Sequence, residues 1–322
     1  MTQSPLVAIV IVTYNSADVI LDCLRSLGDF DSRELEIIVV DNNSTDDTVT
    51  AIRALHSEVR IIANESNAGF AEAVNTGVAQ ARGSSILLLN PDATISRTTV
   101  MQLREAIVND PTIGLIAPFV SDPTGRVAVI SAGEMPTAWR VFCHYSGLSR
   151  LAGNRAPFAG QYLIPDKSMA GTIDVEWTSG ACMLFLKETW HEAGGLSTRW
   201  FMYAEDVDFC WRILKRGLRI VVDFDLHATH LVGSSSKGNP LESSPSWIVN
   251  LYDFYKTELA RSWMQALAWK LTVAGGLYAR GVVYRLRSLS SKSDGAAWSN
   301  ESTRFRRFAV AVMQLRAYEA GG

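Results

Sequence analysis

Four short apolar runs, each followed by a polar segment, organise the first third of the chain. They cover residues 6–12, 36–40, 59–63 and 86–89. Short continuous runs rich in β-branched residues are typical of strands buried on both faces. Helices are predicted between them, over residues 17–27 with Ser16 as the cap, over about 47–55, and from residue 67 onward. This alternation predicts an α/β fold, with a mainly parallel sheet and flanking helices.

Polar residues follow the end of every predicted strand. Ligands of parallel sheets bind beyond the carboxyl ends of the strands. Taken singly, each polar group is better explained by turn and cap chemistry. Their joint placement at one edge favours a binding site. The residues are Thr13, Tyr14 and Asn15 after the first strand, Asp41, Asn43 and Ser44 after the second, Asn67 and Gly69 after the third, and Asn90 and Asp92 after the fourth.

The phosphate-binding loops of common nucleotide folds are missing from the sequence. No GxGxxG follows the first strand, and no Walker loop occurs. A cradle of backbone amides is therefore not expected. A divalent cation bound to carboxylates is the remaining way to hold a pyrophosphate, because Mg²⁺ and Mn²⁺ prefer oxygen ligands and bridge phosphates. Asp92, at the end of a buried strand, is well placed for such a cation.

Three acidic residues stand among aromatic side chains at residues 200–212. Glu205, Asp206 and Asp208 lie within four positions of one another. Carboxylates among apolar rings resist removal from water, so such a cluster often serves a cation or a reacting proton. Acids that open a helix, stabilised by its dipole, explain the same pattern. The strand-end residues shift the balance toward a site.

Several motifs together resemble the inverting family 2 glycosyltransferases with the GT-A fold, close to the bacterial rhamnosyltransferase-like branch. The resemblance spans about residues 6–236 and implies a Rossmann-like, mainly parallel sheet. The motifs are Val-Ile-Val-Thr-Tyr-Asn at 10–15, Val-Asp-Asn-Asn-Ser-Thr-Asp at 40–46, Asn-Ala-Gly-Phe at 67–70, Asn75, Leu-Asn-Pro-Asp-Ala at 89–93 and Phe-Met-Tyr-Ala-Glu-Asp-Val-Asp at 201–208.

The resemblance implies roles for individual residues. Asn90 stands where the family's DXD metal motif has its first aspartate, so Asp92 and His230 are the implied ligands of Mg²⁺ or Mn²⁺. His227 and the other histidines are expected to be structural. The implied nucleotide-binding residues are Thr13, Tyr14, Asn15, Asp41, Asn43, Ser44, Asn67, Gly69, Asn75 and Asn90, and the implied donor and acceptor pocket contains Trp177, Ser179, Gly180, Ala181 and, in a flap at residues 234–237, Lys237.

Inverting sugar transfer gives the acidic cluster a task. The reaction needs a base for the acceptor hydroxyl and a cation for the departing diphosphate. By position, Asp206 is the implied base, and Glu205 orients the acceptor or the base. Burial and neighbouring charge should raise the pKa of the base toward neutrality. Asp208 is expected to be structural.

The rest of the chain divides into a second half of the catalytic domain and a helical region. We expect a helix over 99–108, a strand over 113–118, a loop-rich acceptor-side segment over 121–172 and a strand over 174–186. Helices are expected from 246, over 263–289 and over 304–318, with a polar loop at 288–302. The predicted domains are 1–240, with a nucleotide-sugar half of about 1–120 and an acceptor half of about 121–240, and 241–322.

The C-terminal helices combine aromatic and basic residues. This composition suits an anionic membrane surface. It equally suits packing on the catalytic domain or on a second copy in a homo-oligomer.

Composition limits the partners and the compartment. The 322 residues carry a net charge of −3 with a pI near 6.0, so we expect no nucleic-acid partner. The four cysteines form no CxxC pair, which indicates buried thiols in a reducing compartment. No apolar run reaches about 18 residues, and no signal peptide is recognised. We expect the chain in the cytoplasm or at the inner face of the cell membrane.

The expected reaction moves L-rhamnose from dTDP-rhamnose to a hydroxyl of a lipid-linked or cell-surface glycan precursor. The alternative within the class is a UDP-hexose or UDP-galactofuranose donor. A sugar nucleotidyltransferase would need a Gly- and Arg-rich loop after the first strand, which is absent. A silent sugar-nucleotide-binding protein would be favoured by loss of the acid pair, yet Glu205 and Asp206 are both present.

Overall fold

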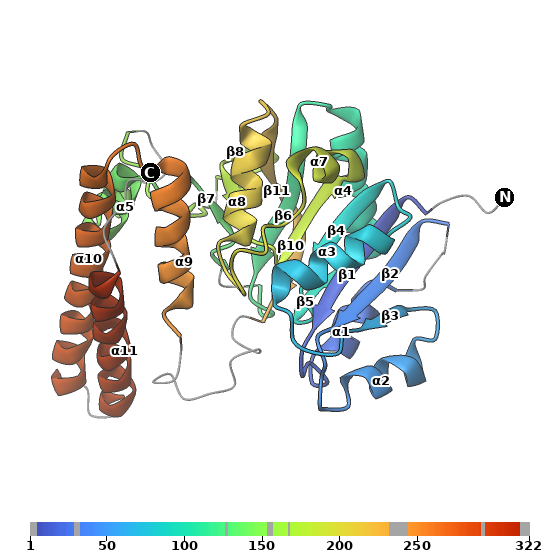
Figure 1. The fold of residues 1–322 in the computed structure, drawn as a ribbon, viewed down its shortest axis with the longest axis horizontal. Helices are drawn as coiled ribbons and strands as arrows, with labels where there is room; N and C mark the ends of the chain where they lie inside the picture. Colours follow the sequence, from blue (N-terminus) through green and yellow to red (C-terminus); the bar gives the residue numbers. More distant parts are fainter. Residues whose placement is uncertain are drawn as a thin grey trace. The chain divides into compact units, whose positions relative to one another are not determined.

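The computed structural model describes residues 5–28, 33–125, 128–152, 157–166, 168–231, 244–290 and 294–315. The chain forms two compact units (Figure 1). The first unit comprises Met1–Gly133 and Pro165–Ser235, and the second comprises Glu134–Ile164 and Ser236–Gly322. The second unit thus takes in a segment that we assigned to the acceptor half. The domain boundaries at residues 120 and 240 stay a prediction.

The first unit is built on one mixed sheet of strand order β3-β2-β1-β4-β10-β6-β11-β5. Strands β1 (Val7–Thr13), β2 (Leu35–Asp41), β3 (Arg60–Ala63) and β4 (Ser85–Leu89) run parallel. Every residue of β2 and β4 is buried, including the polar residues Glu36, Asp41 and Ser85 that stand at or near the strand ends. The apolar residues between them are those expected of strands covered on both faces. The four strands predicted from the apolar runs, and the α/β class, are confirmed.

The second half of the sheet mixes strand directions. β10 (Cys182–Leu186) lies antiparallel between β4 and β6 (Ile113–Ser121). β11 (Arg219–His230) runs parallel to β6 and antiparallel to both β5 (Ala93–Ile95) and β8 (Thr172–Val175). The pairing of β5 with β11 brings residues far apart in the sequence to one edge.

The single strand predicted over 174–186 is wrong. The segment divides into β8, β9 (Trp177–Thr178) and β10, and β9 pairs with β7 (Ala132–Gly133) in a separate two-stranded sheet. Two backbone hydrogen bonds explain the break. The Glu176 amide donates to the Gly133 carbonyl at 2.8 Å, and the Ser179 amide donates to the Ser131 carbonyl at 2.7 Å. These bonds draw residues 176–179 away from the main sheet.

Helices of the first unit pack on this sheet. They are α1 (Ile20–Ser26), α2 (Thr48–Leu55), α3 (Phe70–Gln80), α4 (Arg97–Asn109), α7 (Lys187–Ala193) and α8 (Glu205–Leu214). The cap predicted for Ser16 is wrong, because α1 begins only at Ile20 and the Ser16 hydroxyl bonds the backbone of Tyr14 instead. The helix predicted over 99–108 is confirmed as α4, which Ser96 caps at 3.0 Å.

The second unit is helical. It contains α5 (Ala138–Ser146), α6 (Leu148–Ala152), α9 (Ser246–Phe254), a π-helix (Tyr255–Leu259), α10 (Trp263–Ser290) and α11 (Gly295–Gln314). Trp269 lies at its centre. The indole is fully buried, stacks on Tyr255 with ring centroids 5.5 Å apart, and donates from Nε1 to the Pro136 carbonyl at 2.8 Å.

Two predicted irregular segments are helical in part. The segment 121–172 contains α5 and α6, because Thr137 caps α5 and Gly147 ends it in the left-handed conformation. The polar loop predicted over 288–302 is mostly helix, since α10 continues to Ser290 and α11 begins at Gly295. The prediction failed there because polar residues, among them the buried Ser302, stand inside these helix ends.

The four cysteines are buried free thiols, as predicted. None of the described helices combines the length and the apolar character that a membrane span requires.

Candidate active site

The ends of β1 and β2 meet at one carboxylate. Thr13 and Asp41 are partners in the strand register. The Asp41 carboxylate accepts hydrogen bonds from the Thr13 hydroxyl at 2.8 Å, from the Ser44 hydroxyl at 2.6 Å and from the Ser44 amide at 2.9 Å. Asp41 is buried. Its two oxygens offer about four lone pairs, so one acceptor position remains for a ligand.

Asn15 joins the loops that follow β1 and β2. Its amide donates to the Ser44 hydroxyl at 2.8 Å, and its Oδ1 accepts from the Thr45 amide at 2.8 Å. Asn15 and Asn43 have φ values of 51° and 64°, the left-handed region that asparagine tolerates. The Tyr14 ring beside them is half exposed. The structure therefore brings together the predicted residues of both strand ends around a rigid pair of turns.

The predicted residues after β3 lie at the start of α3. The Gly69 amide donates to Asn67 Oδ1 at 3.1 Å. The Gly69 carbonyl accepts from Asn42 Nδ2 at 3.1 Å. Sequence reasoning missed Asn42, a buried residue whose Oδ1 also accepts from Asn64 at 2.8 Å. Its position directly after Asp41, at the end of a predicted strand, could have indicated that it belongs to the site.

Asp92 and His230 lie together although 138 residues separate them. The pairing of β5 with β11 sets His230 opposite Ala93. His230 Nε2 is 3.0 Å from Asp92 Oδ1 and 3.4 Å from Asn90 Nδ2. Among the described residues, no group of three acidic, histidine or cysteine side chains could hold a metal. One carboxylate and one imidazole nevertheless fit a cation whose other ligands are phosphate oxygens and water.

Glu205 and Asp206 begin α8 after a strained turn. Tyr203 and Ala204 have φ values of 72° and 78°, which non-glycine residues rarely adopt. Such strain persists only where surrounding contacts impose it. The Asp206 carboxylate accepts from the Val207 amide at 2.8 Å and from the Gly180 amide at 3.2 Å. Glu205 is 4% exposed, and its Oε2 is buried without a hydrogen-bond partner among the residues that the structure describes.

The environment of the two acids separates their protonation. Burial, followed by the neighbouring Asp206 charge, raises the pKa of Glu205 to about 8. Burial also raises the pKa of Asp206, while the amides of Gly180 and Val207 favour its ionised form. The two amides thus make Asp206 the acid of the pair that ionises first, while Glu205 keeps its proton near neutral pH. A neutral acid beside a fixed carboxylate is suited to proton abstraction.

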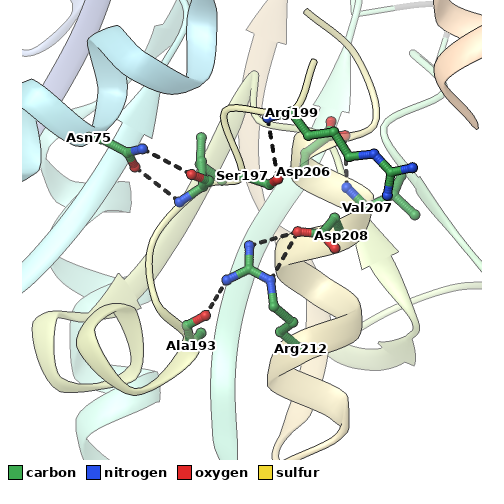
Figure 2. Close-up of polar contacts among 9 residues, drawn as sticks. Asn75, Ala193, Ser197, Arg199, Asp206, Val207, Asp208 and Arg212 are labelled. Atoms are coloured by element: carbon green, nitrogen blue, oxygen red, sulfur yellow. Dashed lines mark hydrogen bonds and ion pairs between the residues drawn. The ribbon is translucent and has the colours of Figure 1, made fainter. Parts of the chain in front are cut away.

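The third acid and Asn75 hold the loop before α8 (Figure 2). Arg212 contacts Asp208 Oδ2 from Nε at 2.9 Å and from Nη2 at 2.8 Å, and donates from Nη1 to the Ala193 carbonyl. Asn75 donates to the Leu196 carbonyl at 2.9 Å and accepts from the Leu196 amide at 3.0 Å. The Asn75 contacts shown are to the protein backbone, and its role toward a nucleotide stays a prediction.

The segment after β9 connects the acid pair to Asn90, which lies next to the Asp92–His230 pair. Gly180 bonds Asp206, and the adjacent Ala181 carbonyl accepts from the Asn90 amide at 2.9 Å. The Ala181 amide donates to the Ser179 hydroxyl at 3.2 Å. Trp177 lies on β9 opposite Gly133. Lys237 and the flap predicted at 234–237 lie outside the described residues.

Comparison with known proteins finds a family and a protein that are similar to this chain in sequence. Residues 8–162 match the profile described as Glycosyl transferase family 2. An N-acetylglucosaminyl-diphospho-decaprenol L-rhamnosyltransferase of Mycobacterium tuberculosis is 27% identical over 281 residues, which cover 82% of this chain and 88% of that protein.

Two solved structures share the fold. A mannosyltransferase from Pyrobaculum calidifontis, in complex with GDP-Man and Mn²⁺, has a TM-score of 0.58 at 19% identity, with 97% of this chain and 88% of that chain covered. GalNAc-T7 with UDP, GalNAc and Mn²⁺ has a TM-score of 0.57 at 16% identity, with 95% and 55% covered.

Replacement of Gly69 by alanine should destabilise the first unit. A Cβ there would lie 2.5 Å from the Phe201 carbonyl oxygen, and φ is +87°. We expect a loss of at least about 2 kcal/mol in the free energy of unfolding, measured by urea denaturation. Gly217→Ala is the control, because Gly217 has φ +80° and no atom of the described part of the chain lies within 4 Å of the added carbon. Equal losses in the two variants would contradict the clash with Phe201.

The raised pKa of Glu205 predicts a pH-dependent stability. Folded Glu205 keeps its proton up to about pH 8, whereas the unfolded group loses it near 4.5. Between these values the folded state binds more protons, so this residue makes stability fall as pH rises, by at most about 1.4 kcal/mol per pH unit. Glu205→Gln should flatten that decline in denaturation curves taken across pH 4.5–8.

The matched control is Glu72→Gln, a change at an exposed position on α3. This variant should keep the slope of the wild-type chain. A Glu205→Gln variant with the wild-type slope would show that Glu205 is ionised in the folded protein.

Proposed function

Because this chain belongs to glycosyl transferase family 2 and is a glycosyltransferase of GT-A fold, we propose that it transfers L-rhamnose from dTDP-L-rhamnose to a hydroxyl of a lipid-linked glycan precursor, with inversion. The observation that carries the chemistry is the Asp206 carboxylate, held by the Gly180 and Val207 amides beside a protonated Glu205. The donor and acceptor are proposed from the printed function of the mycobacterial relative.

The ends of β1 and β2 would bind the nucleotide. The one remaining acceptor position on Asp41 suits the N3–H of a pyrimidine base, and the exposed Tyr14 ring could stack on the base face. The hydroxyl of Ser44 and the turn at Asn43 lie beside the ribose in this arrangement. Thymine and uracil carry the same N3–H, so Asp41 does not distinguish dTDP from UDP. This is the reason to keep a UDP-hexose or UDP-galactofuranose as the second candidate donor.

Asp92 and His230 would hold Mg²⁺ or Mn²⁺, and both solved relatives contain Mn²⁺. When bound, the cation would neutralise the charge that develops on the departing diphosphate. Two protein ligands leave positions for phosphate oxygens. The cation and donor are therefore expected to bind together rather than independently.

The acid pair would handle the acceptor proton. Asp206 takes the hydroxyl proton as the acceptor oxygen bonds to the anomeric carbon, and the bond from that carbon to the diphosphate oxygen breaks on the opposite side. The neutral Glu205 spares the site a second buried charge. Phe201, Met202 and Tyr203, all exposed next to the pair, offer apolar surface to an acceptor sugar.

We propose that the reaction takes place in the cytoplasm at the inner face of the cell membrane, where a lipid-linked acceptor is within reach. Four buried free thiols suit a reducing compartment.

The base assignment predicts a selective loss in Asp206→Asn. Transfer should fall by about 10²–10⁴-fold, the usual contribution of a general base, while donor binding is retained. Asp208→Asn is the control, because that acid bonds Arg212. It should lower the melting temperature more than the transfer rate. Turnover measured with radiolabelled donor sugar would refute the assignment if Asp206→Asn kept wild-type activity.

The donor and cation are tested together by thermal shift. dTDP-rhamnose at about 100-fold over its Kd should raise the melting temperature by roughly 5 °C, because ligand binding stabilises the native state by mass action. The shift should require Mg²⁺ or Mn²⁺ and should shrink in Asp92→Ala. Asp225→Ala, at an exposed position on β11, should keep it. A shift with UDP sugars alone would reject the rhamnosyl donor, and a metal-independent shift would reject the cation site.

A further inference from the structure

One face of α10 is apolar and exposed along its whole length. Successive members of this face are separated by three or four residues, so they form one stripe. At about 1.5 Å per residue the stripe is roughly 40 Å long. The exposed fraction of its large side chains runs from 40% at Val282 to 71% at Leu289. The apolar stripe consists of Met264, Ala268, Leu271, Gly275, Tyr278, Val282, Leu286 and Leu289.

The opposite face of α10 already has partners. Trp269, Val273 and Leu277 are buried in the core of the second unit, together with Phe305 and Phe308 of α11. α10 and α11 run side by side as an antiparallel hairpin, and the Ser302 hydroxyl donates to the Gly281 carbonyl at 2.8 Å (Figure 1). The apolar stripe is thus additional to what the fold buries. Exposed apolar surface of this extent usually marks an interaction site.

The hairpin is strongly basic. Residues 263–315 contain eight lysine and arginine residues but only two acidic ones, a net charge of +6 in a chain whose total is −3. α10 itself contains no acidic residue. Of the two acids, Glu301 pairs with Arg304 at 2.7 Å, and Asp294 stands at the N-terminus of α11. The positive charge of this hairpin is therefore concentrated in one part of an acidic protein.

Arginines border the apolar stripe. The Arg306 guanidinium lies 5.7 Å from the centroid of the Tyr278 ring, which belongs to the stripe. Arg285 is exposed between stripe residues near the end of α10. Arg306 and Arg307 also line a hollow of about 410 Å³ on α11, with Thr303 and Gln314 as further polar groups and Val310 among the apolar ones. Cationic and apolar groups in one hollow suit an amphiphile with an anionic head.

We propose that α10 and α11 dock the protein on an anionic lipid bilayer. The apolar stripe would lie at the boundary of headgroups and acyl chains, and Arg285, Arg306 and Arg307 would contact lipid phosphates. The docking surface is independent of the sugar donor. Its use, to keep the enzyme near a lipid-linked acceptor, rests on the proposed function.

Charge selects a bilayer over a second copy of the chain. The spacing of the stripe would also allow a helix pair between two copies. That pairing would bring two hairpins of charge +6 together, and like charges across an interface oppose association. An anionic bilayer supplies the opposite charge. Each basic residue near such a surface strengthens binding by about fivefold, and salt weakens the attraction.

Co-sedimentation with vesicles tests the proposal on the full chain without nucleotide sugar. We expect binding to mixed phosphatidylcholine–phosphatidylglycerol vesicles at low salt, and little binding to pure phosphatidylcholine. The double change Arg306→Glu with Arg307→Glu should weaken binding at least about tenfold. The pair Arg53→Glu with Arg216→Glu is the matched control, because it makes the same charge change at exposed positions of the first unit.

The apolar contribution needs its own variant. Leu286→Ser with Leu289→Ser keeps the charge and should also weaken vesicle binding several-fold, whereas Leu55→Ser, at an exposed leucine of α2, should not. Each variant is expected to fold, because all the altered side chains are exposed. Circular dichroism melting curves provide the check.

Three outcomes would overturn the proposal: equal binding to neutral vesicles, an arginine double variant that binds as well as its control, or absent vesicle binding together with a dimer that the Leu286→Ser and Leu289→Ser changes dissociate. The last outcome assigns the stripe to a second copy. A chain that binds anionic vesicles yet transfers no sugar would refute the proposed function alone.

Discussion

The burial of two neighbouring carboxyl groups is the constraint on which the site depends. Removing both from water is costly if both are ionised, so Glu205 keeps its proton and Asp206 takes the available donors. Those donors are backbone amides, whose orientation is fixed by the conformation of the chain. To place them, the chain adopts left-handed conformations at Tyr203 and Ala204. The Phe201 carbonyl accepts from the Phe70 amide at 3.0 Å, which anchors the strained loop to α3.

The sheet and the loops contribute differently to the site. Strand register places Thr13 beside Asp41, and the pairing of β5 with β11 places His230 beside Asp92, so these contacts are as rigid as the sheet. The acid pair instead depends on a chain of single hydrogen bonds through Gly180 and Ala181 to Asn90. A small displacement of residues 179–181 would therefore move Asp206 away from Asp92 and His230 without unfolding the sheet.

The sequence was informative where one strong physical effect acts, and misleading where several weak ones compete. Apolar runs predicted the first four strands, and the motifs predicted which residues gather at their ends. The break within 174–186 could not be seen, because it depends on hydrogen bonds to Ser131 and Gly133, more than forty residues away. The Ser16 cap failed because its hydroxyl bonds the Tyr14 backbone, while its amide donates to the distant Thr48 hydroxyl at 2.8 Å. The contact of Asn75 with Leu196 could not be predicted either, because 121 residues separate the two in the sequence.

Whole-chain charge hides the separation of charge along this sequence. A total of −3 excluded nucleic acid, yet it is the balance of a basic hairpin and a more acidic remainder. A uniformly basic protein would bind anionic surfaces through any face, including the face that carries the proposed donor and cation site. Confining the positive charge to residues 263–315, beside an exposed apolar stripe, restricts attraction to one part of the chain. The proposed catalytic acids and the proposed lipid-binding arginines can then be altered independently, because they are different residues.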